Sequence, residues 1–328
     1  MKVAIYGAGA IGGLIGSRLS RAGVAQVSVV ARGATLAALQ QRGWHLREPD
    51  GAEGSAPVRA SDQPEVLGPQ DLVVVAVKGP AMAEVAQRIG PLLGPGTLVL
   101  TAMNGVPWWF SQATPALAGA PLASVDADGR IAAAIGLERV LGAVVHASAS
   151  SPAPGVVHHA GGRGLIIGEP RGGDSARVQQ VVALLQAAGF EATASAQLRQ
   201  DLWYKLWGNL TMNPVSALTG ATIDQILADP LVRAFCSAAM REAAVIGERL
   251  GCGLSQSPED RHQVTARLGA FRTSMLQDVD AGRPLELDAI VGAVQEMGQR
   301  LGVATPSIDA LLGLTRLMAR QRGLYPRM

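Results

Sequence analysis

The sequence is poor in lysine, cysteine and charge, and each shortage argues against a class of protein. Charged residues make up 16% of the 328 residues, the net charge is +2, and no run rich in basic residues occurs, so a nucleic-acid-binding surface is not expected. The two cysteines, Cys236 and Cys252, form no CxxC pair and accompany no histidine cluster, which argues against a zinc site or a disulfide framework. No apolar run reaches the roughly 18 residues that span a bilayer. We therefore expect a cytoplasmic protein without metal, membrane or nucleic acid.

The N-terminal segment has two interpretations. Residues 3–17 are apolar and rich in glycine after Lys2, a composition that a signal peptide with an Ala-Gly-Ala cleavage site would share. The density of glycine and the helical spacing that follows at once favour a folded segment instead. We expect a strand at 2–6, a turn, and a helix at 10–22.

Apolar, β-branched segments alternate with helical patterns through the first third of the chain. Strands are predicted at 2–6, 26–31, 71–78 and 95–105, with helices between them. The continuous apolar run at 71–78 is typical of a parallel strand covered on both faces. The alternation predicts an α/β fold with an N-terminal Rossmann-type, doubly wound parallel sheet.

The pattern changes after residue 138. From Gln197 onward only helical spacing occurs. We therefore expect a Rossmann-type domain over 1–199 and an all-helical domain over 200–328. Within the first domain, short strands separated by glycine and proline turns suggest an antiparallel extension of the sheet; they are predicted at 140–148, 155–161 and 164–170.

A glycine-rich turn directly follows the first predicted strand, where Gly7-Ala8-Gly9-Ala10-Ile11-Gly12 matches GxGxxG. In dinucleotide-binding folds the first glycine permits the tight turn, the second lets the backbone approach the pyrophosphate, and the third permits close helix–strand packing. The N-terminus of the following helix attracts the phosphates. Glycine accounts for 40 of 328 residues, so the motif alone is weak, but its place between strand and helix predicts a dinucleotide site.

The residue at the end of the second predicted strand bears on the choice of cofactor. An acidic residue there would bind the ribose 2′-hydroxyl of NAD, but the sequence has Arg32 and no acid. A guanidinium suits a 2′-phosphate through its charge and planar donors. The alternative is an ordinary surface arginine at a strand end. We expect NADP(H) rather than NAD.

The chain contains 25 arginines and only three lysines, namely Lys2, Lys78 and Lys205. Unlike arginine, a lysine can be tuned by burial to act as a general acid or base. Lys78 follows a predicted central strand, and ligands of open α/β sheets bind at the carboxyl ends of strands; the alternative is a solvated strand end. Lys205 shares one face of a predicted helix with Asn209 and Asn213. That polar stripe either faces solvent or lines a cleft.

At these residues the chain resembles the ketopantoate reductase (2-dehydropantoate 2-reductase) family, over nearly its whole length. The Lys–Asn–Asn helix and the Ser-Met-Leu-Gln-Asp segment, with a glutamate twelve residues after the serine, are the specific signals, whereas the glycine motif is shared with many families. The matching segments are GAGAIG at 7–12, VKGP at 77–80, MNG at 103–105, PGVVHHAGG at 154–162, LWYKLWGNLTMNPVSALTG at 202–220 and SMLQDVDAGRPLELD at 274–288.

The resemblance implies a reductase of pantothenate biosynthesis that converts 2-dehydropantoate to pantoate with NADPH, and a possible homodimer through the helical domain. In such a reaction the nicotinamide supplies a hydride and an ammonium stabilises and protonates the developing alkoxide. The implied roles are Lys205 as general acid, Glu286 as contact of Lys205 and substrate, Asn104 at the nicotinamide–substrate junction, Asn209, Asn213 and Ser274 as substrate ligands, and Gly7, Gly9, Ala10, Ile11, Gly12, Arg32 and Lys78 as cofactor-binding residues.

Several alternatives remain open. Glu286 can pair with Arg283 on a first helical turn, and Ser274 can be an ordinary mid-helix hydroxyl. The same scaffold can reduce another 2-oxo acid or oxidise a 2-hydroxy acid, and a non-catalytic NADP(H)-binding regulator is a rival from another class. Two departures from the family concern specificity: Met103 stands where the family often has glutamine, and 108–136 looks like an insertion beside Asn104.

Overall fold

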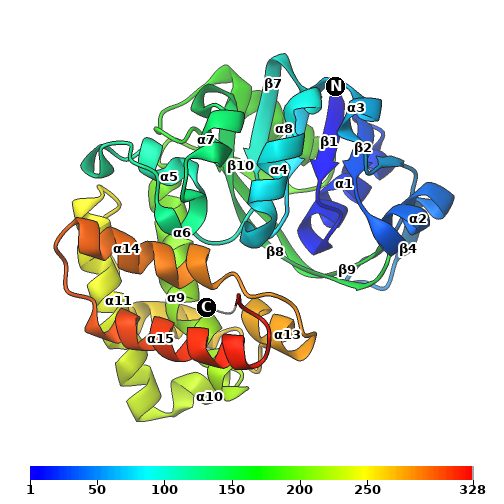
Figure 1. The fold of residues 1–328 in the computed structure, drawn as a ribbon. Helices are drawn as coiled ribbons and strands as arrows, with labels where there is room; N and C mark the ends of the chain where they lie inside the picture. Colours follow the sequence, from blue (N-terminus) through cyan, green and yellow to red (C-terminus); the bar gives the residue numbers. More distant parts are fainter. Residues whose placement is uncertain (327–328) are drawn as a thin grey trace. The chain divides into compact units, whose positions relative to one another are not determined.

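The computed structural model describes residues 1–326, which form two compact units (Figure 1). The sheet unit comprises Met1–Met103 and Gly129–Leu198, and the helical unit comprises Asn104–Asp128 and the chain from Arg199 onward. The sequence analysis assigned 104–128 to the N-terminal domain, and the structure groups this segment with the helices instead. The segment packs against helices α9 (Leu198–Thr219) and α14 (Ala293–Arg300) of the helical unit.

The sheet unit contains one ten-stranded sheet in the order β4-β3-β9-β8-β7-β6-β1-β2-β5, with β10 also paired to β9. Its strands are β1 (Lys2–Tyr6), β2 (Gln26–Val30), β3 (Trp44–Arg47), β4 (Glu53–Ala56), β5 (Arg59–Ser61), β6 (Gln70–Val75), β7 (Leu93–Thr101), β8 (Val140–Ala153), β9 (Val156–Gly168) and β10 (Glu191–Ser195). Its α-helices are α1 (Ala10–Ala22), α2 (Gly33–Arg42), α3 (Pro64–Leu67), α4 (Met82–Arg88), α7 (Arg130–Ala134) and α8 (Ala176–Ala187). Short 3₁₀ turns lie at Gly79–Ala81 (η1), Gly90–Leu92 and Leu137–Arg139.

The central strands are parallel and covered on both faces, as the sequence predicted. β1 pairs in parallel with β2 and β6, and β6 with β7. In β1, Val3 and Ile5 point into a core shared with α1 and α8, while Ala4 on the opposite face is also fully buried. Burial on both faces explains why these strands are apolar without alternation. The Rossmann-type doubly wound sheet is confirmed.

The antiparallel extension is also present, but its strands are longer than predicted. The expected separate strands at 155–161 and 164–170 are one continuous strand, β9, paired antiparallel with β8 across several register shifts. Gly161 and Gly162 lie at positive φ within β9, so the glycines where the first predicted strand ends accommodate irregular pairing instead of forming a turn. β3, β4 and β5 were not predicted; they are three or four residues long.

The helical unit confirms the expectation of an all-helical C-terminal region. Its longest helix, α9, runs over 22 residues with Pro214 inside. No helix among residues 1–326 is long and apolar enough to cross a membrane. The helices are α5 (Trp109–Gln112), α6 (Ala123–Asp126), α9 (Leu198–Thr219), α10 (Ile223–Ala228), α11 (Pro230–Arg249), α12 (Pro258–Ala266), α13 (Ser274–Asp280), α14 (Ala293–Arg300) and α15 (Pro306–Gln321), with a 3₁₀ turn at Pro115–Leu117 and a π-helical turn at Asp288–Gly292.

Candidate active site

The glycine turn has the backbone geometry that a dinucleotide-binding turn requires. Gly7 has φ +104°, and a Cβ on it would lie 2.7 Å from Val77 Cγ1. A Cβ on Gly12 would lie 2.0 Å from the Gly7 carbonyl oxygen, so this helix can pack against the strand only if the residue is glycine. A Cβ on Gly9 would meet no atom of residues 1–326 within 4 Å. The second glycine therefore borders open space, where the fold binds a pyrophosphate.

Helix α1 begins directly at this turn. Gly9 is its N-cap and has no side chain to satisfy the first backbone N–H groups. Ala10 and Ile11 form the first turn of a 13-residue helix with no acidic residue at that end. Backbone donors and the helix dipole therefore both favour an anion here. The residues present fit a dinucleotide phosphate.

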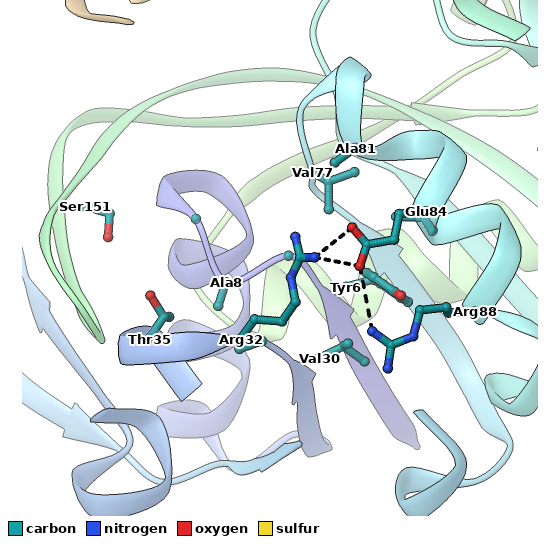
Figure 2. A pocket seen from close by; sticks show the side chains of 14 residues that line it. Tyr6, Ala8, Val30, Arg32, Thr35, Val77, Ala81, Glu84, Arg88 and Ser151 are labelled. Atoms are coloured by element: carbon teal, nitrogen blue, oxygen red, sulfur yellow. Dashed lines mark hydrogen bonds and ion pairs between the residues drawn. The ribbon is translucent and has the colours of Figure 1, made fainter. Parts of the chain in front are cut away.

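Arg32 borders a pocket of about 370 Å³ beside the glycine turn, but it is already paired (Figure 2). Its Nη1 donates to both carboxylate oxygens of Glu84 on α4, at 2.6 and 2.7 Å. Arg88 approaches the same carboxylate at 3.7 Å from the other side. The pocket thus presents two guanidinium groups and one carboxylate, an excess of one positive charge at its rim. Glu84 was not predicted, since nothing in the local sequence of α4 indicates which strand end this acid faces.

Lys78 directly precedes η1, at the carboxyl end of β6. The residue is half-buried, so it is not the fully solvated strand end of the alternative interpretation. Val77, its neighbour, lines the pocket next to Arg32. This places Lys78 in the region of the sheet where ligands of such folds bind.

Three of the predicted residues come together in the helical unit. The Lys205 ammonium donates to Asn104 Oδ1 at 2.9 Å, and it also interacts electrostatically with Glu286. Arg283, the alternative partner of Glu286, instead pairs with Asp278 at 3.1 Å. An amine and an amide from separate segments are therefore hydrogen-bonded, and a carboxylate from a third segment acts on the amine electrostatically.

Burial sets the charge of Lys205. Removal of the ammonium from water lowers its pKa from 10.5 to about 8, and the Glu286 carboxylate opposes that shift. The carboxylate on its own would raise the pKa, and burial on its own would lower it. The larger effect of burial leaves an amine that can give up its proton near neutral pH.

The two asparagines continue the polar face of α9. Asn209 is half-buried and Asn213 is only 5% exposed. The Nδ2 of Asn213 is buried without a hydrogen-bond partner within the described part of the chain. A buried donor without an acceptor costs about 1–3 kcal/mol, and the burial of Asn213 shows that this part of the polar face is not open to solvent.

Ser274 stands at the start of a helix. It is the first residue of α13, where Thr273 acts as N-cap by accepting from Leu276 N–H at 3.2 Å. Ser274 is exposed, and within residues 1–326 no hydrogen bond joins its hydroxyl to Lys205 or Glu286. The alternative interpretation of Ser274 as a mid-helix hydroxyl is wrong, because the residue stands at a helix start.

The segment 104–128 packs on the helices that carry the site. Phe110 stacks on Trp203 of α9, with ring centroids 6.1 Å apart. Glu296 of α14 accepts from the backbone N–H groups of Ala123 and Ser124 at 2.8 and 2.9 Å and so caps α6. These contacts explain why the segment belongs to the helical unit. The tryptophans Trp108 and Trp109 are almost fully buried, as packing residues are.

A histidine and the two cysteines have structural surroundings. His159 lies between Glu48 and a backbone carbonyl, with its Nδ1 2.8 Å from the carboxylate. Cys236 and Cys252 are free and buried, and burial raises their thiol pKa to about 12 and about 11. Within residues 1–326, no group of three or more His, Cys, Asp or Glu side chains is arranged to hold a metal ion.

Comparison with protein families matches both parts of the chain. Residues 3–172 match the family described as Ketopantoate reductase PanE/ApbA, and residues 197–319 match the one described as Ketopantoate reductase PanE/ApbA C terminal. Together these segments cover most of the sequence.

Individual relatives agree. The 2-dehydropantoate 2-reductase of Mesorhizobium japonicum is 45% identical over 99% of this chain and 100% of its own length, and that of Halobacterium salinarum is 30% identical over 98% and 99%. A crystal structure from Ralstonia solanacearum MolK2, provisionally described as a ketopantoate reductase, is 55% identical with a TM-score of 0.95 and 99% coverage of both chains. D-mandelate dehydrogenase, solved with NADH, shares the fold at 21% identity, a TM-score of 0.83 and coverage of 98% and 100%.

Proposed function

Because the chain belongs to the ketopantoate reductase PanE/ApbA family, we propose that it reduces 2-dehydropantoate to pantoate with NADPH and that Lys205 donates the proton. Membership makes the chain an oxidoreductase that uses a nicotinamide cofactor. The substrate, the choice of NADP(H) and the roles of individual residues are our proposal.

The observation that supports Lys205 as the proton donor is its hydrogen bond to Asn104, together with its electrostatic interaction with Glu286. The bound nicotinamide supplies the hydride for the carbonyl carbon. The Lys205 ammonium binds the carbonyl oxygen, stabilises the negative charge that develops there, and transfers one proton to it. Lys205 is then a neutral amine, which its pKa of about 8 permits, and it regains a proton from water. Asn104 and Glu286 hold the amine in place.

The asparagines bind the substrate in this proposal. The buried, unpaired Nδ2 of Asn213 and the carboxamide of Asn209 donate to carboxylate and hydroxyl oxygens. Carboxamides orient an anionic substrate without a further charge near Lys205. Ser274, exposed at the start of α13, is proposed as an additional hydroxyl ligand.

The proposal that the cofactor is NADP(H) depends on the glycine turn and on Arg32. The turn with α1 binds the pyrophosphate, and the net positive rim formed by Arg32, Arg88 and Glu84 favours a 2′-phosphate. Lys78 is proposed to lie beside the bound cofactor. The helical unit provides the substrate site and, by analogy with a relative from Staphylococcus aureus described as dimeric, a homodimer contact.

A panel of 2-oxo acids tests the proposal directly. NADPH oxidation by the purified protein is expected to be fastest with 2-dehydropantoate, and Lys205→Ala is expected to remove most of kcat while NADPH binding, measured by fluorescence titration, is retained. Arg59→Ala, on β5 and outside the pocket, is the matched surface control. A faster reaction with another 2-oxo acid would contradict the assignment of 2-dehydropantoate and identify that acid as the better substrate. Cofactor binding without turnover of any acid would favour a non-catalytic regulator.

A further inference from the structure

The helix that follows Glu286 starts with an irregular turn. Asp288–Gly292 is π-helical, and the N–H of Ala293 bonds to the carbonyl of Asp288, five residues back. Regular α-helix follows as α14. Single π turns within helices are rare and occur frequently at functional sites. This one begins two residues after the carboxylate that faces Lys205.

The wider turn makes a carbonyl available to the loop that carries Asn104. In an α-helix the Ala293 N–H would bond to the carbonyl of Ala289; here that oxygen accepts from the N–H of Val106 at 2.8 Å. Gly105, between Asn104 and Val106, has φ +77°, and a Cβ on it would lie 2.6 Å from the same oxygen. The π turn is thus bonded directly to the loop whose asparagine accepts from Lys205.

The segment that follows α15 forms two hydrogen bonds with the residues in and just before the π turn. The Tyr325 hydroxyl donates to Asp288 Oδ1 at 2.5 Å. One residue earlier, the carbonyl of Leu324 accepts from the N–H of Leu285 at 3.1 Å, next to Glu286. After α15 the chain therefore turns back to the segment that enters α14 (Figure 1).

We propose that Tyr325, through Asp288 and the π turn, is a positioning residue that fixes Glu286 and the Asn104 loop on the Lys205 amine. Glu286 sits at the start of the helix, where its carbonyl accepts from Ile290 N–H at 3.2 Å. The turn therefore determines where both partners of Lys205 lie. This inference rests on the proposed function only where it treats Lys205 as the proton donor.

The charges around the pair favour a fixed hydrogen bond. Burial raises the pKa of Asp288, while Tyr325, Arg316 and Arg320 oppose that rise. Burial and the neighbouring Asp288 carboxylate raise the Tyr325 pKa to about 12, against Arg316 and Arg320. The hydroxyl is therefore a donor throughout the neutral range, and the guanidinium of Arg320 lies 5.5 Å from the Tyr325 ring centroid.

The scarcity of lysine makes the test direct. With lysine labelled at the ε-carbon by ¹³C, only three side-chain resonances are expected, and Lys2→Arg and Lys78→Arg assign that of Lys205. Titration then reports the Lys205 pKa without any turnover. Tyr325→Phe removes one hydroxyl from a half-buried residue. Tyr204→Phe is the matched control: Tyr204 precedes Lys205 in the chain, but its hydroxyl donates to Gln256 at 2.9 Å and accepts from Arg261 at 3.4 Å.

Loss of the hydrogen bond from Tyr325 to Asp288 in Tyr325→Phe is expected to move Glu286 away from the Lys205 amine. The Lys205 pKa should then fall by about half a unit or more. Glu286→Gln should shift it in the same direction and further, and Tyr204→Phe should leave it unchanged. An unchanged Lys205 pKa in Tyr325→Phe, or an equal shift in Tyr204→Phe, would overturn the inference. Absence of NADPH-dependent turnover in the wild type would refute the proposed function alone.

Discussion

At the scale of single residues, Lys205 is under two opposing influences. Burial favours the neutral amine, whereas Glu286 favours the ammonium. The outcome, a pKa of about 8, keeps most of the amine protonated at neutral pH and still lets it release a proton. An arginine in its place would stay charged, which gives a physical reason for a lysine in a chain so rich in arginine.

The two directions of the reaction are therefore expected to depend oppositely on pH. Reduction needs the protonated amine, so kcat for 2-oxo acid reduction should fall as the pH rises through about 8. Oxidation of the 2-hydroxy acid needs the neutral amine and should rise over the same interval. Initial rates in both directions between pH 6 and pH 10, with saturating cofactor, are the measurement. Parallel profiles would exclude Lys205 as the titrating group.

Cofactor preference is expected to follow the Arg32–Glu84 pair. Arg32→Ala should weaken NADPH binding by about 10- to 100-fold, the loss expected for a charge-assisted hydrogen bond, with little effect on NADH. Glu84→Gln should improve the preference for NADPH, because it releases Arg32 and removes a negative charge from the rim. Dissociation constants for both cofactors, with Arg59→Ala as control, measure this. Equal losses for NADH and NADPH in Arg32→Ala would contradict the assignment.

At the scale of elements, the strand–turn–helix unit depends on the third glycine of the motif. Gly12→Ala places a Cβ 2.0 Å from the Gly7 carbonyl and is expected to destabilise the protein by about 1–3 kcal/mol and to abolish NADPH binding. Gly313→Ala in α15 is the matched control, because its Cβ meets no atom of residues 1–326 within 4 Å. It should stabilise the protein by about 0.5–1 kcal/mol. Denaturant midpoints distinguish the two.

Elements with a strong local pattern were predictable from the sequence. β1, α1 and the polar face of α9 follow from hydrophobic spacing within single segments. β4 and β5 were missed because Glu-Gly-Ser-Ala and Arg-Ala-Ser carry no apolar alternation, and their pairing partners determine them. The π turn was also hidden, because it depends on the Val106 N–H, which lies far away in the sequence.

The candidate site divides in the same way. Lys205, Asn209 and Asn213 share one helix, so their common face follows from spacing alone. Asn104 and Glu286 came from the family resemblance, and only the structure shows the bond between Asn104 and Lys205. No local pattern marks the pairing of Glu84 with Arg32 or of Tyr325 with Asp288, since the two residues of each pair lie on different elements.

At the scale of the whole molecule, a buried charged network links α1, β9 and the β3–β4 turn. Burial alone would raise the pKa of Glu48, but hydrogen bonds from His159 and Arg18 hold it below its ordinary value of 4.5. A carboxylate with a lowered pKa contributes stability above its unfolded pKa and loses it as the pH falls through its folded pKa.

The stability of the protein should therefore decline as the pH falls below about 4.5, the ordinary pKa of Glu48. Glu48→Gln should reduce stability at pH 7 and flatten that decline. Urea midpoints between pH 7 and pH 3 provide the measurement, with Glu53→Gln as control, because Glu53 lies in exposed pairs. A decline of unchanged slope in Glu48→Gln would assign acid sensitivity to other carboxylates.

The shortage of lysine and cysteine also determines how the whole molecule reacts with electrophilic reagents. Both thiols are buried with raised pKa values, so thiol-directed reagents find little thiolate. Of the three lysines, Lys78 and Lys205 are half-buried and Lys2 is exposed. Lys2 is therefore the most accessible lysine, whereas Lys205, with its lowered pKa, has the larger neutral and nucleophilic fraction of amine at neutral pH. A cysteine introduced on the surface would be a single, selective handle.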